Sequence, residues 1–186
     1  SACHSSHPMN LGGVGVTGNL AANTIARDAD LIISVGSRLS DFTTGSKELY
    51  GATKLVSVNI SPFDANKMDA TMVIGDAKAT LEMAHEALAA KSYVSGYAGE
   101  SQAAKTAWKE EYARFAAYRY GENFQPIIPA RHEPTIAEQV ALNGGEITQV
   151  SAITLIRNTI DPNAIIVGAS GSLPGDLQRM WTTDQK

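Results

Sequence analysis

Short apolar runs alternate with amphipathic stretches through the first half of the chain. Residues 31–35, 54–60 and 71–74 are nearly continuous apolar segments, and each is followed by glycine or turn residues. Unbroken runs of this length predict strands that are buried on both faces of a parallel sheet. Residues 17–29 and 76–90 carry apolar side chains at helical spacing, which predicts helices. Strands alternating with helices predict an α/β fold, with a parallel sheet flanked by helices.

The helix expected over residues 76–90 has a clear start and a clear apolar stripe. Asp76 is a typical N-cap residue, because its carboxylate can accept a hydrogen bond from an amide of the first turn. Leu81 and Leu88 lie on one face of this helix. Burying each leucine would contribute about 1.5–3 kcal/mol, so we expect the stripe to pack against the sheet.

The second half of the chain divides into a helix, a linker and the start of another domain. Ser101 is expected to cap a helix with aromatic residues on one side, and residues 121–145 hold three prolines and a Gly-Gly pair, as linkers do. Residues 148–160 predict a helix and residues 164–167 a short buried strand. We therefore expect a central α/β domain at 1–93, a helix and linker at 94–145, and the first helix and strand of a second α/β domain at 146–186.

The charge and cysteine content exclude several classes of partner. The net charge is −4 and basic residues are not clustered, which argues against binding to nucleic acid or to an anionic membrane surface. No run approaches 18 apolar residues, so no membrane span is expected. Cys3 is the single cysteine, a usage that fits a reducing cytoplasm. We expect a cytoplasmic protein.

A glycine motif at residues 13–18 matches the dinucleotide-binding fingerprint in spacing only. Gly13, Gly15 and Gly18 have the G-x-G-x-x-G spacing, and Asp41 lies near the position of a ribose-binding acid. In a true fingerprint a hydrophobic strand precedes the glycines and directs the helix N-terminus at the pyrophosphate. Residues 7–11 have no strand-like apolar run. The context therefore argues against a dinucleotide fingerprint.

The order of these segments resembles the central domain of thiamine-diphosphate-dependent enzymes. The similar segments are a glycine loop followed by AAN, an AD pair before an apolar strand, G-x-R-x-x-D, KLVSVNISPFDANKM and VIGDAKATLEM. The resemblance covers residues 5–93 and resumes at 146–186. It implies that residues 1–93 are a Rossmann-like central domain lacking its N-terminal strands, and that residues 146–186 are the start of the pyrophosphate-binding domain. HPMNLGGVGVTGNLAAN and SDFTTGSK are most similar to the branch that opens the ring of a trihydroxycyclohexane-1,2-dione in myo-inositol degradation.

This resemblance implies a reaction and its cofactors. The parent enzyme would be a hydrolase of a carbon–carbon bond that uses thiamine diphosphate and Mg²⁺. Acetolactate synthases are the nearest relatives of this branch, so a carboligase is an alternative. A noncatalytic nucleotide-binding or assembly domain, using the groove over residues 13–41, is an alternative of another class. Whether FAD or ADP occupies the central domain stays open.

Two groups of candidate cofactor-binding residues follow from the resemblance. The first lies where the strand expected at 164–167 enters a small-residue loop, and such loops can present backbone amides to phosphates; its residues are Ser172, Leu173, Pro174, Gly175 and Asp176. Alternatively, this segment is a helix entry in which Asp176 complements the helix dipole. The second group is at the expected carboxyl end of the first strand; its residues are Gly36, Arg38 and Asp41. There, an ion pair between Arg38 and Asp41 is the alternative to ligand contact.

The family resemblance also indicates what these 186 residues lack. The glutamate that activates the cofactor and the Gly-Asp-Gly segment that binds its metal are not found in the sequence. We therefore expect no catalytic residue and no metal ligand in this chain. We expect an internal part of a larger enzyme, inactive alone, whose partners are the remaining domains of the parent chain and further copies of it in a homo-oligomer.

Overall fold

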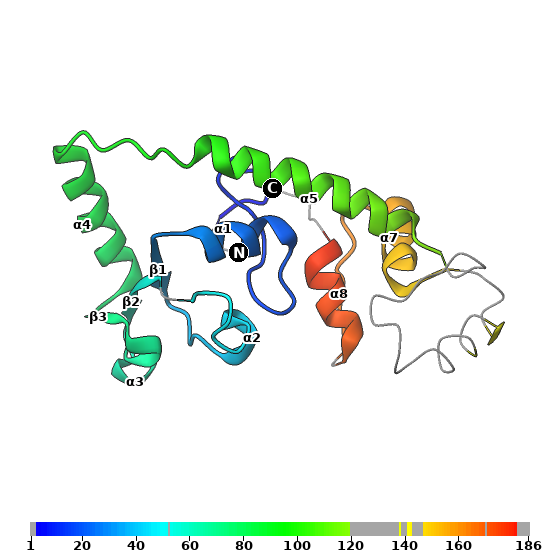
Figure 1. Ribbon diagram of the computed structural model, residues 1–186, viewed down its shortest axis with the longest axis horizontal. Coiled ribbons are helices and arrows are strands. Elements are labelled where there is room, and N and C mark those ends of the chain that lie inside the picture. The colour runs from blue at the N-terminus through cyan, green and yellow to red at the C-terminus, as the bar shows by residue number, and fades with distance from the viewer. Residues whose placement is uncertain are drawn as a thin grey trace. The chain divides into compact units, whose positions relative to one another are not determined.

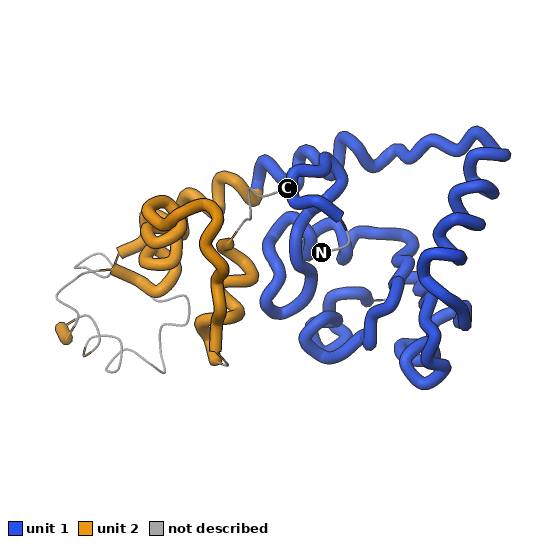
Figure 2. Tube along the Cα trace, turned by 180° about the vertical axis from the view of Figure 1, so that it is seen from behind, with its two compact units in different colours: residues 1–107 blue, residues 108–186 orange. Residues whose placement is uncertain are grey.

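The computed structural model describes residues 3–51, 53–119, 138, 141–142, 147–169 and 171–181. The chain forms two compact units, residues 1–107 and residues 108–186, which Figure 2 shows in different colours.

The first unit is built on a three-stranded parallel sheet. Its strands are β1 (Leu31–Val35), β2 (Lys54–Asn59) and β3 (Thr71–Ile74), in the order β1-β2-β3. The register places Ser34 of β1 opposite Ser57 of β2. The sequence prediction of a parallel α/β sheet is confirmed, with each strand within one residue of its predicted range.

Helices connect and flank these strands (Figure 1). The helices of the first unit are α1 (Leu20–Asp28), α2 (Asp41–Thr44), α3 (Pro62–Ala65), the 3₁₀ turn η1 (Lys67–Asp69) and α4 (Ala77–Ala90). The helix start predicted at Asp76 is confirmed, because its carboxylate accepts a hydrogen bond from the amide of Ala79 at 3.0 Å. Asn19 caps α1 in the same way, through the amide of Ala22.

A small apolar core lies on one face of the sheet. Leu39, Tyr50 and Leu55 are buried together, and Ala26 of α1 and Ile32 of β1 pack against them. The Tyr50 hydroxyl donates a hydrogen bond to the carbonyl of Thr43 at 3.1 Å. Burial raises the pKa of this hydroxyl. The core therefore fixes the segment between β1 and β2 against the sheet.

Two predictions about burial in this unit are wrong. Ile33 of β1 is 59% exposed, although its strand was expected to be buried on both faces. Leu81 and Leu88 of α4 are 51% and 45% exposed, although their stripe was expected to pack on the sheet. The sequence pattern identifies residues suited to burial, whereas their burial depends on which elements cover them. Within the described residues, that cover is incomplete.

Helix α5 (Ala98–Ala117) runs across the boundary between the two units. It begins three residues before the cap predicted at Ser101, whose side chain is buried inside the helix rather than at its end. Trp108 packs edge-on against Tyr112, with ring centroids 6.0 Å apart. The predicted aromatic side of this helix therefore makes contacts within the helix itself.

The second unit contains α7 (Gln149–Thr159) and α8 (Ser172–Met180). The predicted helix at 148–160 is confirmed, with Thr148 as its N-cap. The predicted strand at 164–167 is wrong: these residues form no strand, and Ile165 is 90% exposed. A parallel strand needs a neighbour to satisfy its backbone groups, and the described part of this unit offers none.

Candidate functional site

The glycine-rich segment before α1 forms a loop folded tightly on itself. Gly12 and Gly15 have φ values of 92° and 106°, which favour glycine strongly. A Cβ at Gly15 would lie 2.0 Å from the carbonyl oxygen of Phe42, and one at Gly18 would lie 2.5 Å from that of Gly13. These two glycines are therefore needed for close packing of backbone on backbone.

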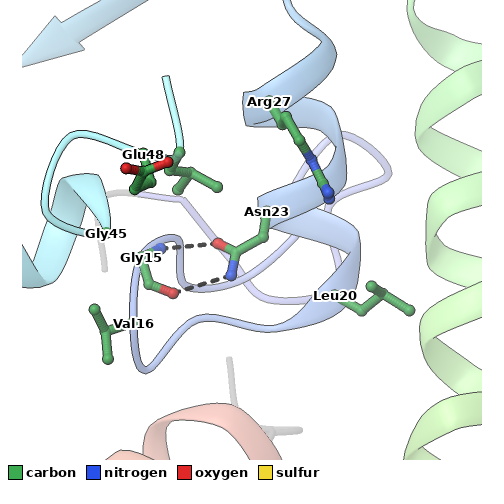
Figure 3. Close-up of a pocket in the computed structure, with 8 residues that line it drawn as sticks. Gly15, Val16, Leu20, Asn23, Arg27, Gly45 and Glu48 are labelled. Atoms are coloured by element: carbon green, nitrogen blue, oxygen red, sulfur yellow. Dashed lines mark hydrogen bonds between the residues drawn. The ribbon is translucent and has the colours of Figure 1, made fainter. Parts of the chain in front are cut away.

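Two asparagine side chains of α1 and its cap hold this loop closed. Asn23 makes a pair of hydrogen bonds to Gly15, accepting from its amide at 2.9 Å and donating to its carbonyl at 3.0 Å (Figure 3). Asn19 caps α1 and also donates to the carbonyl of Leu11 at 2.7 Å. Asn23 is the last residue of the AAN sequence noted above. It therefore has a structural role, which is to clamp the glycine loop onto α1.

Several backbone donors of this loop are already used within the protein. The Val16 amide donates to the carbonyl of Phe42 at 2.8 Å, and the Gly18 amide donates to that of Gly15 at 2.9 Å. The Gly12 amide donates to the Asn10 side chain at 2.8 Å. A pyrophosphate site needs free amides aimed at the ligand. Residues 3–19 also contain no strand, so the interpretation that this is not a dinucleotide fingerprint agrees with the geometry.

An open hollow of about 440 Å³ lies beside the closed loop. Figure 3 shows Asn23 reaching across to Gly15, with Arg27 one turn further along α1 and Glu48 on another wall. The hollow is lined by Gly15, Val16, Leu20, Asn23, Arg27, Gly45, Glu48 and Leu49. Its walls combine apolar side chains with one cation and one anion, a lining that can take a small amphipathic group.

The carboxyl end of β1 carries the candidate residues Gly36, Arg38 and Asp41. Gly36 has φ 65°, and Leu39 has φ 44° with its side chain in the core. The turn therefore buries Leu39 and leaves Arg38 exposed to solvent. Asp41 is the first residue of α2 and is exposed too. Among the described residues, no ion pair joins Arg38 to Asp41, so the ion-pair alternative for these two side chains is wrong.

Asn59 at the end of β2 is a residue that the sequence interpretation missed. Its buried side chain donates to the carbonyl of Ser37 at 3.0 Å and accepts from the amide of Ser61 at 3.0 Å. Its own carbonyl accepts from the amide of Gly75. One asparagine thereby joins the exits of all three strands. An asparagine at the end of an apolar run, directly before Ser-Pro turn chemistry, is the sequence signal that could have indicated it.

A charged pair lies next to the same edge of the sheet. The Lys67 ammonium contacts the Asp64 carboxylate at 2.7 Å and donates to the carbonyl of Arg38 at 2.9 Å. The hydrogen bond from Lys67 lowers the pKa of the Asp64 carboxyl, and the charges of Lys67 and Arg38 lower it further. Lys67 also lies 5.0 Å from the ring centroid of Phe63. This edge therefore presents the exposed ring of Phe63 beside a lysine that is already paired within the protein.

The second group of candidate residues begins α8. The structure places Ser172, Leu173, Pro174, Gly175 and Asp176 within the helix and not in a loop before it. Gly171 precedes them with φ 134°, and a Cβ added there would meet no atom within 4 Å. Asp176 accepts a hydrogen bond from Gln149 of α7 at 2.6 Å. Asp176 therefore joins two helices, while the backbone at the helix start is approachable at Gly171.

The described residues contain neither a metal site nor a membrane span. No group of three or more His, Cys, Asp or Glu side chains in the described part of the chain could hold a metal ion. No helix in that part is long and apolar enough to cross a bilayer.

Comparison with known proteins finds a domain family that matches part of the first unit. Residues 1–84 match the family described as thiamine pyrophosphate enzyme, central domain. This range contains the glycine loop, the three-stranded sheet and the candidate residues at the end of β1.

Similarity to individual proteins extends beyond that domain. The chain is 55% identical over 186 residues to a 3D-(3,5/4)-trihydroxycyclohexane-1,2-dione hydrolase of Clostridium perfringens, covering 99% of this chain and 29% of the relative. Proteins of the same name are 54% identical in Clostridium botulinum, over 99% of this chain and 29% of the relative, and in Geobacillus thermodenitrificans, over 95% and 27%. The chain thus spans less than a third of the length of these curated relatives.

Proposed function

Because the chain belongs to the thiamine pyrophosphate enzyme family through the central domain at residues 1–84, we propose that it forms part of an enzyme that opens the ring of a trihydroxycyclohexane-1,2-dione by hydrolysis. The observation that carries this proposal is the identity of 54–55% over 95–99% of the chain to proteins named for that reaction. The identity includes residues beyond the family match, so the similarity is not limited to a widely shared domain.

The reaction breaks the carbon–carbon bond between two adjacent carbonyl groups. Addition of water across that bond leaves one carbon as a carboxylic acid and the other as an aldehyde. Thiamine diphosphate supplies the electron sink that makes cleavage next to a carbonyl possible, and the protein binds and orients the reactants. We include Mg²⁺ as the metal that accompanies the diphosphate.

The start of α8 is the part of this chain that fits a diphosphate. The first amides of a helix have no partner within the helix and carry partial positive charge. The open space around Gly171 would let a phosphate approach the amides of Ser172 and Leu173. The surface beside the phosphate would be formed by the first turns of α8, at Leu173, Pro174, Gly175 and Asp176. Asp176 would also hold α8 to α7 through its hydrogen bond from Gln149.

The central domain would have a binding and positioning role. Asn59 joins the strand exits and the core holds the turn at Leu39, so Gly36, Arg38 and Asp41 are presented on a fixed edge. Ligands of open α/β sheets bind at such carboxyl ends. We assign no catalytic residue and no metal ligand to this chain. Its partners would be the other domains of the enzyme and further copies in a homo-oligomer, in the cytoplasm.

A reconstitution assay on the complete protein tests the proposal. Protein stripped of cofactor by dialysis against a chelator should release no acid from the trihydroxycyclohexane-1,2-dione, as followed with a pH indicator. Adding thiamine diphosphate together with Mg²⁺ should restore acid release, with one acid and one aldehyde formed per dione consumed. Absence of cofactor-dependent acid release would overturn the proposal.

The same preparation distinguishes the two alternatives. A carboligase related to acetolactate synthase would form carbon–carbon bonds from α-keto acids and leave the dione unchanged. A noncatalytic nucleotide-binding domain would retain ADP or FAD, detectable by mass or absorption spectrometry, and would support neither reaction. Under our proposal the complete protein should be colourless, so a stoichiometric flavin spectrum would favour the synthase branch.

A further inference from the structure

Residues 3–11 contain no helix or strand, yet hydrogen bonds hold them in a compact loop. The His7 amide donates to the carbonyl of His4 at 3.0 Å, and the Asn10 amide donates to that of His7 at 2.9 Å. The Asn10 side chain also donates to the carbonyls of Cys3 and His4. Asn10 therefore makes most of these hydrogen bonds, which hold the loop together. Residues 3–11 are few enough to be displaced as a unit.

A lysine from a distant helix fastens the loop. The Lys105 ammonium, on α5, donates to the carbonyl of His7 at 3.1 Å and to that of Pro8 at 2.6 Å. Hydrogen bonds from a charged donor are roughly twice as strong as those between neutral groups. Lys105 is 97 residues from Pro8 in the sequence, so this contact is the product of tertiary structure and not of a local turn.

The fastened loop leads directly into the closed glycine loop. The Asn10 side chain accepts from the amide of Gly12, and the Leu11 carbonyl accepts from the side chain of Asn19, the cap of α1. Hydrogen bonds therefore run without interruption from Lys105 to the beginning of α1. A displacement of the loop at His7 would remove support from Gly12.

Helix α5 is held to the first unit at a second point, near its own start. The Tyr97 hydroxyl donates to the Asp30 carboxylate at 3.2 Å, in the segment between α1 and β1. Tyr97 and Lys105 are eight residues apart, about two helical turns. The first half of α5 is thereby aligned on the first unit, and Lys105 makes its contact with the loop at residues 7–10.

We propose that Lys105 is a positioning residue whose ammonium clasps residues 7–10 to α5 and, through Asn10, supports Gly12 at the start of the glycine loop. Release of this clasp would free the amides of His7, Asn10 and Gly12 without unfolding the sheet. The device is independent of the proposed reaction, because it rests on contacts within the first unit alone.

Hydrogen exchange on the complete protein tests this proposal with matched variants. Lys105→Met keeps the aliphatic stem and removes the ammonium, so exchange at the amides of His7, Asn10 and Gly12 should accelerate by about ten- to a hundredfold. Lys105→Arg keeps a charged donor and should restore most of the protection. Lys109→Met is the control, because Lys109 is exposed one turn further along α5 and has no hydrogen-bond partner among the described residues.

Three results would overturn the proposal. One is unchanged exchange at those three amides in Lys105→Met. Another is equal acceleration in Lys109→Met, which would indicate a general charge effect. The third is acceleration that extends to the amides of β2, which would show that Lys105 supports the whole unit and not the loop. Local acceleration in Lys105→Met, with protection regained in Lys105→Arg, supports the clasp.

Discussion

Replacement of Gly15 by alanine is the most direct test of the closed glycine loop. The new Cβ would lie 2.0 Å from the Phe42 carbonyl oxygen and 2.9 Å from the Thr43 Cα. Both are backbone atoms, so no side-chain rotation can relieve the overlap. The segment at Phe42 would have to move, and that would break the hydrogen bond from the Val16 amide to the Phe42 carbonyl.

The expected cost follows from these contacts. A non-glycine residue at φ 106° is in a sparsely populated region and costs about 1–3 kcal/mol. The lost Val16 hydrogen bond costs about 0.5–1.5 kcal/mol, and weakening of the two bonds to Asn23 costs a similar amount each. We therefore expect Gly15→Ala to lower the free energy of unfolding by about 2.5–7.5 kcal/mol.

Gly51→Ala is the matched control for this measurement. Gly51 also has a positive φ, 47°, but a Cβ there would meet nothing within 4 Å. Its cost should be limited to the left-handed conformation itself, about 1–2 kcal/mol. Urea unfolding followed by far-ultraviolet circular dichroism measures both variants. Equal destabilisation by the two substitutions would refute the conclusion that the loop is closed by backbone contact at Gly15.

Three further predictions address the candidate cofactor site, the core and the charged edge. Gly175→Val in the complete protein should weaken thiamine diphosphate binding measured by titration calorimetry, because a bulky side chain in the first turns of α8 would obstruct close approach; wild-type affinity would exclude this site. Leu55→Ala should lower the free energy of unfolding by about 2–5 kcal/mol, because it leaves a cavity in the core. Leu81→Ala should lower it clearly less, because Leu81 is half exposed. Urea unfolding that gives the reverse order would contradict the described core. Lys67→Met should raise the pKa of Asp64 towards its ordinary value, as read by carbon NMR titration, because the ammonium lowers it. The stability from this pair is therefore present above the ordinary carboxyl pKa and is lost as the pH falls through the lowered value, and an unchanged titration of Asp64 would show that Lys67 does not cause the shift.

The strands and helix starts could be predicted because their causes are local. The apolar runs at β2 and β3 are followed at once by turn residues, and Asp76 precedes a periodic apolar stripe. Such signals are contained within a few residues of sequence. The predicted start of α5 was wrong. Ser101 is a good cap by residue type, but it lies inside the helix, and its burial is set by tertiary contacts.

The burial of side chains and the closed form of the glycine loop could not be predicted in the same way. The exposure of Ile33 and of residues 164–167 depends on what lies beside them in space. The glycine spacing at residues 13–18 is compatible with an open phosphate-binding loop or a closed one. The difference is made by Asn23, eight residues along the chain from Gly15, and by Phe42 from another segment. The cofactor-binding roles of Arg38, Asp41 and the start of α8 stay predictions, and Gly175→Val tests the role of the start of α8.

The outer edge of β1 has a consequence for handling the chain in solution. In the described sheet β1 has a neighbour on one side only, and its side chains Leu31 and Ile33 are about half exposed. An apolar strand edge of this kind is a template for pairing with another strand. A preparation of these 186 residues should therefore self-associate as concentration rises, and Ile33→Lys should improve its solubility, since a charged side chain on an edge strand opposes intermolecular pairing.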